Sequence, residues 1–191
     1  ISVSIRDLSV VGYSDVTDGV GIYCRHVADS EIVGCTLSKI ALAAISISDS
    51  YNVSVKSCNI SDCERSGYGY GIVIGNSSAN ITLSENRIMR CRHCITHGGV
   101  PGIGQCRDVL ITNNILTGGS ADVIDAHPIC ERISIIGNII NATYGLRAIN
   151  AGAKYLTISD NIIHNGYVDM RGPIVCESLV VTGNTYTGVS G

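Results

Sequence analysis

The sequence contains no Trp and no Phe, and aromatic residues make up only 5% of its 191 residues. Apolar residues nevertheless reach 45%, so the core must be built from Ile, Val, Leu and Ala together with Cys. Such small side chains pack in thin, closely spaced layers that large rings would disturb. The composition therefore indicates a narrow core and excludes one assembled around aromatic anchors.

Charge is also scarce, because charged residues account for 15% of the chain and the net charge is −3. A chain with this balance gains no electrostatic attraction to nucleic acid, so no nucleic-acid partner is expected. No apolar run approaches the ~18 residues of a membrane span, and no signal peptide is recognisable. Metal-ligand spacings such as CxxC…CxxC or HExxH do not occur. We predict neither a membrane span nor a metal or other cofactor.

The chain does have a repeat, in which apolar residues alternate and an Asn follows at a fixed offset. Five segments show this pattern most clearly: Asn80–Ile88, Asp108–Leu116, Arg132–Ile140, Tyr155–Ile163 and Ser178–Tyr186. Earlier repeats carry Cys or Leu at the Asn position. This position, called the ladder position below, is occupied by Leu8, Cys35, Cys58, Asn86, Asn114, Asn138, Asn161 and Asn184.

Successive ladder positions are 23 to 28 residues apart, which predicts the architecture. Short alternation indicates β-strands, and a period this short suits one coil of strands and turns stacked on the next. We therefore predict an all-β fold, a right-handed parallel β-helix of about eight coils. Stacked Asn residues about 4.8 Å apart can pass side-chain hydrogen bonds from coil to coil, which predicts an interior Asn/Cys ladder.

The unbroken repeat predicts that residues 1–191 form a single β-helix domain. Its first residues already read as a strand, and a β-helix with bare ends would expose its core and strand edges. We expect a segment of a longer chain that lacks its caps. The ends would then be covered by flanking domains or by assembly into a homotrimer.

Most of the nine cysteines recur at equivalent places in the repeat. Free Cys behaves as a small hydrophobe, so buried stacks of thiols explain this placement. The spacing of coils would also permit a disulfide at Cys63–Cys91 or Cys106–Cys130. Both alternatives stay open at the level of sequence.

A second strand follows each ladder position, beginning with Gly21–Arg25. It recurs at Ala44–Ser48, Gly71–Gly75, His93–His97, Val123–His127, Gly145–Ile149 and Tyr167–Arg171. Side chains alternate along a strand, so every other residue must face solvent. The predicted outward residues are mostly uncharged in the first three coils, whereas His, Asp and Arg occupy these positions in the later coils.

The later coils predict a cluster on this outward face, made of His93, His97, Asp125, His127, Arg147, Asp169 and Arg171. His97 and His127 would be vertical neighbours, and Asp125, Arg147 and Asp169 would form a ladder of alternating charge. Histidines gathered on one face favour a functional site because they titrate near neutral pH. The Gly- and Pro-containing loop 98–105 would form a wall beside the site. Exposed strands also carry charged cross-strand pairs for structural reasons alone.

The whole chain resembles the right-handed parallel β-helix superfamily of pectate lyases, polygalacturonases, alginate epimerases and phage tailspikes. Asp125-Ala126-His127 is similar to the Asp-Pro-His-Glu motif of mannuronan C5-epimerases and related lyases, in which the Asp and His act on a uronate. Here Ala126 replaces the Pro, and Pro128 replaces the Glu. The resemblance implies a carbohydrate-active enzyme that acts on an extracellular, acidic polysaccharide.

For lyase or epimerase chemistry we predict His127 as base, with Asp125, His97 and Arg147 as the other catalytic residues. Arg147 would neutralise the uronate carboxylate. The predicted substrate-binding residues are Tyr23, His93, Asp169 and Arg171. For hydrolysis, Asp125 and Asp169 would lie about 9.5 Å apart, a spacing typical of inverting enzymes. The alternative is a non-catalytic stalk or glycan-binding segment of a tailspike, adhesin or surface protein. Either function predicts an extracellular, cell-surface or virion location.

Overall fold

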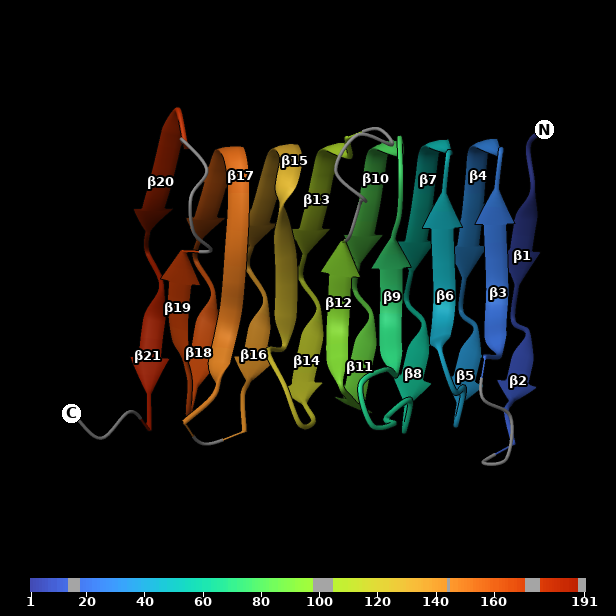
Figure 1. Ribbon diagram of the computed structural model, residues 1–191, viewed down its shortest axis with the longest axis horizontal. Coiled ribbons are helices and arrows are strands. Elements are labelled where there is room, and N and C mark those ends of the chain that lie inside the picture. The colour runs from blue at the N-terminus through green and yellow to red at the C-terminus, as the bar shows by residue number, and fades with distance from the viewer. Residues whose placement is uncertain (14–17, 98–104, 144, 171–175, 189–191) are drawn as a thin grey trace.

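The computed structural model describes residues 1–13, 18–97, 105–143, 145–170 and 176–188. Within these ranges the chain winds as a solenoid of parallel strands and contains no α-helix. Strands of successive coils lie side by side along the long axis of the molecule, from the N-terminal to the C-terminal end (Figure 1). The predicted all-β parallel β-helix is confirmed. In the described part of the chain no helix is long and apolar enough to cross a membrane.

Each coil contributes to three faces. The first face contains β1 (Ser4–Arg6), β4 (Ala28–Val33), β7 (Tyr51–Lys56), β10 (Ala79–Ser84), β13 (Arg107–Thr112) and β20 (Ser178–Thr182). The second face contains β2 (Ser9–Val11), β5 (Thr36–Ser38), β8 (Asn59–Ser61), β11 (Arg87–Cys91), β14 (Ile115–Gly118), β16 (Ile139–Asn141), β18 (Ile162–His164) and β21 (Thr185–Thr187). The third face contains β3 (Val20–Arg25), β6 (Ala43–Ser48), β9 (Tyr70–Ile74), β12 (His93–His97) and β19 (Tyr167–Met170).

Two long strands, β15 (Ile124–Ile136) and β17 (Arg147–Ser159), begin on the third face and continue onto the first. They join these two faces into one sheet, whereas the second face is a separate sheet of eight short strands. Among the described residues, β20 and β21 have no third-face strand after them. The solenoid therefore has about seven complete turns, slightly fewer than the eight coils predicted.

The core consists of rows of aliphatic side chains that run along the axis, one residue from each coil. On the first face, register pairs connect one such row, which becomes exposed at its C-terminal end: Ile5, Ile32, Val55, Leu83, Ile111, Ile135, Ile158 and Val181. On the third face they connect Ile22, Ile45, Ile72, Ile95, Ile124, Ile149 and Val168. Burying each such side chain contributes about 1.5–3 kcal/mol relative to leaving it in water.

The Asn ladder is formed as predicted, at the turn between the first and second faces. Asn114 Oδ1 accepts from the backbone N–H of Asn86 at 2.9 Å and from its side-chain amide at 3.0 Å. Asn114 Nδ2 donates in turn to Asn138 Oδ1 and to the Leu83 carbonyl, both at 2.9 Å. Each buried amide thus satisfies backbone groups that the turn leaves without partners.

The residue before each ladder position adopts a left-handed backbone conformation. The positive φ values occur at Asp7, Gly34, Ser57, Glu85, Asn113, Gly137, Asp160 and Gly183. Gly, Asn and Asp tolerate this conformation best, so these positions mark the corner of the coil in the sequence.

All nine cysteines are free thiols, and eight of them are buried. Cys63 and Cys91 interact through their side chains, and so do Cys106 and Cys130. Of the two sequence-based alternatives, the structure has the stacks of free thiols.

Candidate functional site

One line of side chains on the outside of the third face passes through every described coil that has a strand there. This outer row consists of Tyr23, Ser46, Val73, Thr96, Asp125, Asn150 and Asp169. It changes along the axis from neutral residues to carboxylates and amides. The ionisable and amide side chains are therefore concentrated on β12, β15, β17 and β19, which lie at the middle and C-terminal end of the third face (Figure 1).

His127 lies at the solvent-exposed edge of this site, and the buried Asp125 contacts its ring from beneath. His127 Nε2 lies 3.2 Å from Asp125 Oδ2, and the His127 side chain is 39% exposed while that of Asp125 is 8% exposed. A carboxylate only accepts hydrogen bonds, so the neutral His127 ring carries its proton on Nε2 and has its lone pair on Nδ1. A buried carboxylate that orients an accessible imidazole is the arrangement used in general acid–base catalysis.

His93 approaches the same carboxylate from a buried position. Its Nε2 lies 3.6 Å from Asp125 Oδ2, and its Nδ1 lies 2.6 Å from the backbone carbonyl oxygen of Asp122. Its ring stacks on Tyr70 with centroids 5.8 Å apart. Burial lowers the pKa of His93 below its ordinary value, which favours the neutral ring.

Arg147 connects two further carboxylates. Its Nε donates to Asp122 Oδ1 at 2.9 Å, and its Nη1 lies 3.3 Å from Asp169 Oδ2. The hydrogen bond to Asp122 raises the pKa of Arg147, which therefore stays charged. Asn150 Nδ2 lies 2.9 Å from Asp122 Oδ2 and 3.5 Å from Asp125 Oδ1.

These contacts join seven residues, called the third-face cluster below: His93, Asp122, Asp125, His127, Arg147, Asn150 and Asp169. Five of the eight predicted site residues therefore lie in one network. Their roles in binding or catalysis stay predictions.

The predicted orientation of β12 is wrong. His97 was expected to face solvent beside His127, but it is 1% exposed and pairs with Ile74 and Ala126 in a core row. Burying an imidazole costs free energy, which by itself favours an outward His97. Register is set by the whole strand, and a one-residue slip would expose Ile95, which continues the isoleucine row of the third face. The structure therefore separates His97 from the third-face cluster.

The predicted ladder of Asp125, Arg147 and Asp169 is also wrong in its middle member. Asn150 is the register partner of both Asp125 and Asp169, and Arg147 pairs with Tyr167 three residues earlier in the strand. An irregularity between Arg147 and Ile149 shifts the register. Arg147 reaches the carboxylates through its long side chain instead.

Of the two remaining predicted residues, the structure places Tyr23 away from the cluster and does not describe Arg171. Tyr23 lies in the outer row and is 56% exposed, but four coils separate it from Asp125, which is about 19 Å at the spacing of parallel strands. Arg171 lies outside the described residues, as does most of the loop 98–105.

Sequence reasoning missed Asp122 and Asn150. A signal for Asn150 was present, since it is the single polar residue in the otherwise small and apolar stretch 148–153. Asp122 stands three residues before Asp125, and its importance became visible only through its contacts with Arg147 and Asn150.

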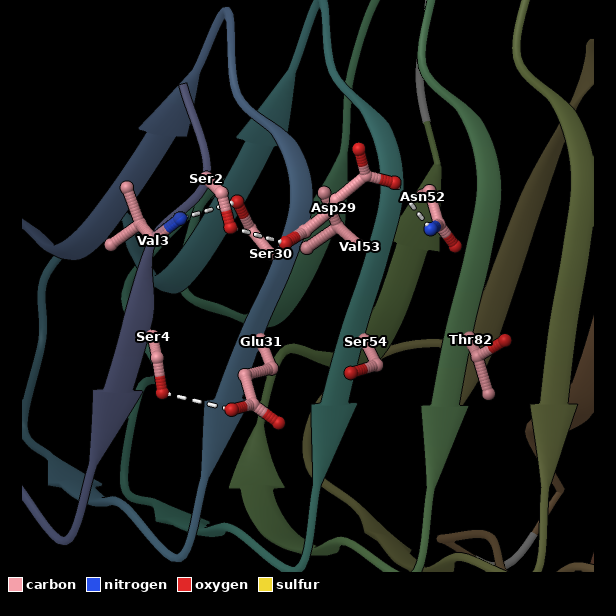
Figure 2. A pocket seen from close by; sticks show the side chains of 10 residues that line it. All are labelled: Ser2, Val3, Ser4, Asp29, Ser30, Glu31, Asn52, Val53, Ser54 and Thr82. Carbon is pink, nitrogen blue, oxygen red and sulfur yellow. Dashed lines mark hydrogen bonds between the residues drawn. The ribbon is translucent and has the colours of Figure 1, made fainter.

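A shallow groove of about 300 Å³ lies elsewhere, on the first face near the N-terminal end (Figure 2). It is lined by Ser2, Val3, Ser4, Asp29, Ser30, Glu31, Asn52, Val53, Ser54 and Thr82. Figure 2 shows Ser4, Glu31, Ser54 and Thr82 side by side on successive strands. Its carboxylates are engaged locally, since Glu31 accepts from Ser4 at 2.8 Å and Asp29 from Asn52 at 2.7 Å. The groove offers polar contacts, whereas the oriented imidazole lies in the third-face cluster.

Comparison with known structures shows the same fold. The chain superposes on the tailspike protein gp49 of Pseudomonas phage LKA1 with a TM-score of 0.78 at 20% identity, covering 97% of this chain and 31% of the tailspike. A pectate lyase from Bacillus sp. N165, solved with trigalacturonate, gives a TM-score of 0.66 at 14% identity and coverages of 98% and 66%. The tailspike of E. coli bacteriophage HK620, solved with a pentasaccharide, gives 0.55 at 14% identity and coverages of 95% and 42%. The chain thus spans less than two thirds of each of these proteins.

No curated protein sequence matches the chain. A family model described as the right handed beta helix region matches residues 3–114, which is more than half of the chain. Together with the parallel three-faced solenoid, this match identifies the fold as that of the pectin lyase-like proteins. The chain belongs to the right-handed β-helix family.

Proposed function

We propose that the third face binds an extracellular acidic polysaccharide and that His127 acts as general base in lyase or epimerase chemistry on its uronate residues. The observation that carries this proposal is the 3.2 Å contact between the half-exposed His127 and the buried Asp125. The carboxylate holds the ring by Nε2, so Nδ1 is the atom that would take the proton next to the uronate carboxylate. In a lyase the electron pair left on carbon would form a double bond as the neighbouring glycosidic C–O bond breaks, and the leaving oxygen would take a proton from water. In an epimerase the same carbon would take back a proton on its opposite face. The occurrence of trigalacturonate with the pectate lyase of the same fold supports the substrate class.

Arg147 has the role of neutralising the substrate carboxylate. Its side chain is 38% exposed and its contacts to Asp122 and Asp169 use Nε and Nη1. The guanidinium carries five N–H donors, so its exposed edge can still bind a carboxylate. Asp122 and Asp169 fix its position on the face.

The geometry favours this chemistry over hydrolysis by Asp125 and Asp169. An inverting pair needs one carboxyl as acid and the other as base toward a water. Asp125 is instead buried against His93 and His127, and Asp169 is paired with Arg147.

A direct test uses a panel of acidic polysaccharides with a neutral glucan as control. It measures ultraviolet absorbance of unsaturated uronate products and reducing ends, which report a lyase, and uronate stereochemistry by NMR, which reports an epimerase. His127→Ala should lower turnover by about 10²–10⁴-fold, the usual contribution of a general base. His164→Ala, a change on the second face, serves as the matched control and should retain activity. Full activity in His127→Ala would contradict the proposal.

A second candidate function is glycan binding without turnover, in a stalk of a tailspike or surface protein. The polar groove on the first face favours it, because hydroxyl, amide and carboxylate groups line up there along the axis. Binding of a polysaccharide without product, abolished by changes in this groove and insensitive to His127→Ala, would support this alternative. Both proposals place the chain outside the cell, on the cell surface or on a virion.

A further inference from the structure

Three side chains of the third-face cluster place potential metal ligands close together beneath the surface. One ligand atom each from His93, Asp122 and Asp125 lies within 4.8 Å of the others. The three residues are 3%, 7% and 6% exposed, respectively. Buried carboxylates next to an imidazole are costly unless a positive charge compensates them.

The hydrogen bond of His93 fixes which nitrogen faces the carboxylates. Nδ1 lies 2.6 Å from the Asp122 carbonyl oxygen, and a carbonyl only accepts, so Nδ1 carries the proton. In the neutral ring, Nε2 therefore presents a lone pair toward Asp125 Oδ2 at 3.6 Å. Two acceptors facing one another at this distance are stabilised by a cation between them. A backbone carbonyl that accepts from the second ring nitrogen is also the usual support of a metal-bound histidine.

Asn150 provides an independent observation. Its Oδ1 is buried and accepts no hydrogen bond from any residue that the structure describes, while its Nδ2 contacts Asp122 and Asp125. Buried acceptors of this kind are rare. Rotation of the amide by 180° would exchange the two atoms. It would place Oδ1 beside both carboxylates and release Asp122 Oδ2 from its hydrogen bond.

We propose that His93 Nε2 and the carboxylates of Asp122 and Asp125 bind a divalent first-row transition-metal ion of the Zn²⁺ type, with Asn150 Oδ1 as an additional ligand. The ring nitrogen excludes a hard, oxygen-only ion such as Mg²⁺ or Ca²⁺ as the preferred occupant. Metal–ligand distances of about 2.0–2.2 Å place neighbouring ligands about 3.3–3.6 Å apart, which the separation of His93 and Asp125 already matches.

The charges of the surrounding residues agree with this assignment. Asp122 and Asp125 bring two carboxylates to the site, and Arg147, paired with Asp122 Oδ1, supplies one guanidinium. Asp122 can keep this contact through Oδ1 while Oδ2 turns to the ion. The metal site does not depend on polysaccharide turnover, so it can be tested separately from the proposed function.

The test uses the whole chain, freed of metal with a chelator and kept reduced. Zn²⁺ binding is measured by competition with a chromophoric chelator, and Co²⁺ serves as a spectroscopic probe. We expect one ion per chain, with visible ligand-field bands and without the thiolate charge-transfer band that the cysteines would produce. His93→Gln and Asp125→Asn should weaken binding by at least about 100-fold, and Asn150→Ala by about 10-fold.

His164→Gln is the matched control, since it changes an imidazole away from the cluster; it should bind Zn²⁺ as the wild type does. Circular dichroism identifies variants that remain folded, and Asn150→Ala keeps the test valid if His93→Gln does not fold. The proposal is overturned by a folded wild type that binds no Zn²⁺, by undiminished binding in His93→Gln, or by a Co²⁺ spectrum with thiolate ligation.

Discussion

Asp125 and Asn150 are register partners on adjacent coils, although 25 residues separate them in the chain, and the Asn150 amide lies 3.5 Å from the Asp125 carboxylate. The amide also contacts Asp122 at 2.9 Å. A neutral side chain therefore stands between two buried carboxylates, where a third negative charge would be unfavourable.

Asn150→Asp tests this relationship. The new carboxylate would have no donor to offer Asp122 or Asp125, and an uncompensated buried charge costs about 3–5 kcal/mol. We expect a lower melting temperature at neutral pH in metal-free buffer and partial recovery as the pH falls and the carboxylates become protonated. Asn150→Ser, which adds no charge, is the control. Equal melting temperatures for the two variants would contradict the explanation.

Replacing one rung of the Asn ladder should destabilise the solenoid. Asn114→Ala removes the acceptor of the Asn86 backbone N–H and the donor to the Leu83 carbonyl. Each buried group left without a partner costs about 1–3 kcal/mol, so denaturant unfolding should show a loss of about 2–5 kcal/mol. Asn114→Cys should cost less, because Cys58, at the same position of an earlier coil, donates to the Ile32 carbonyl. A larger loss for Cys than for Ala would contradict this account.

The buried thiols should be unreactive in the native chain. Burial keeps a reagent away from eight of the nine thiols. It also raises the pKa of Cys24 and Cys94, and that of Cys58 to about 11, so the reactive thiolate is scarce there. Cys176 is the one cysteine that is not buried. A thiol reagent at mildly alkaline pH should therefore label Cys176 rapidly and all nine cysteines only after unfolding. Cys176→Ser should abolish the rapid phase, and rapid labelling of several thiols in the folded chain would show that the prediction is wrong.

Asp62 should make stability depend on pH in the acid range. Hydrogen bonds from the Arg90 guanidinium at 2.6 and 2.9 Å lower the pKa of Asp62 from 3.8 to about 2. The folded state therefore binds the proton more weakly than the unfolded state. The stabilisation is complete above the unfolded pKa and is lost as the pH falls through the folded value.

Because this pair lies at the surface, where solvent screens the charges, its contribution to the free energy of unfolding should be small. Unfolding free energies of the wild type and Asp62→Asn should differ at neutral pH and converge near the folded pKa of about 2. A difference that grows on acidification would have the opposite sign and contradict the assignment. Added salt should reduce the difference at neutral pH.

Much of this fold could be predicted from local patterns. Alternation of apolar residues and the recurrence of Asn at residues 86, 114, 138, 161 and 184 are enough to predict stacked parallel strands, since each coil repeats the same constraints. The inward orientation of Ile124 and Ala126, and hence the outward position of Asp125, follows from the same alternation. The register of β12 and β17 could not be predicted in this way, because neighbouring strands and the irregularity at Arg147 set it.

The sequence by itself determined the solenoid, the Asn ladder and the face on which Asp125 and Asp169 lie. The reason is that a repeat of 23 to 28 residues with alternating apolar positions sets which side chains of each strand point into the core and which point outward. The tertiary structure alone decided that His97 joins the core, that His93 reaches Asp125, and that Asp122 and Asn150 complete the cluster. Such contacts depend on shifts of one to three residues between coils and on the reach of individual side chains. The register shifts and the side-chain contacts are both set by packing between neighbouring coils, which the sequence of one coil does not specify.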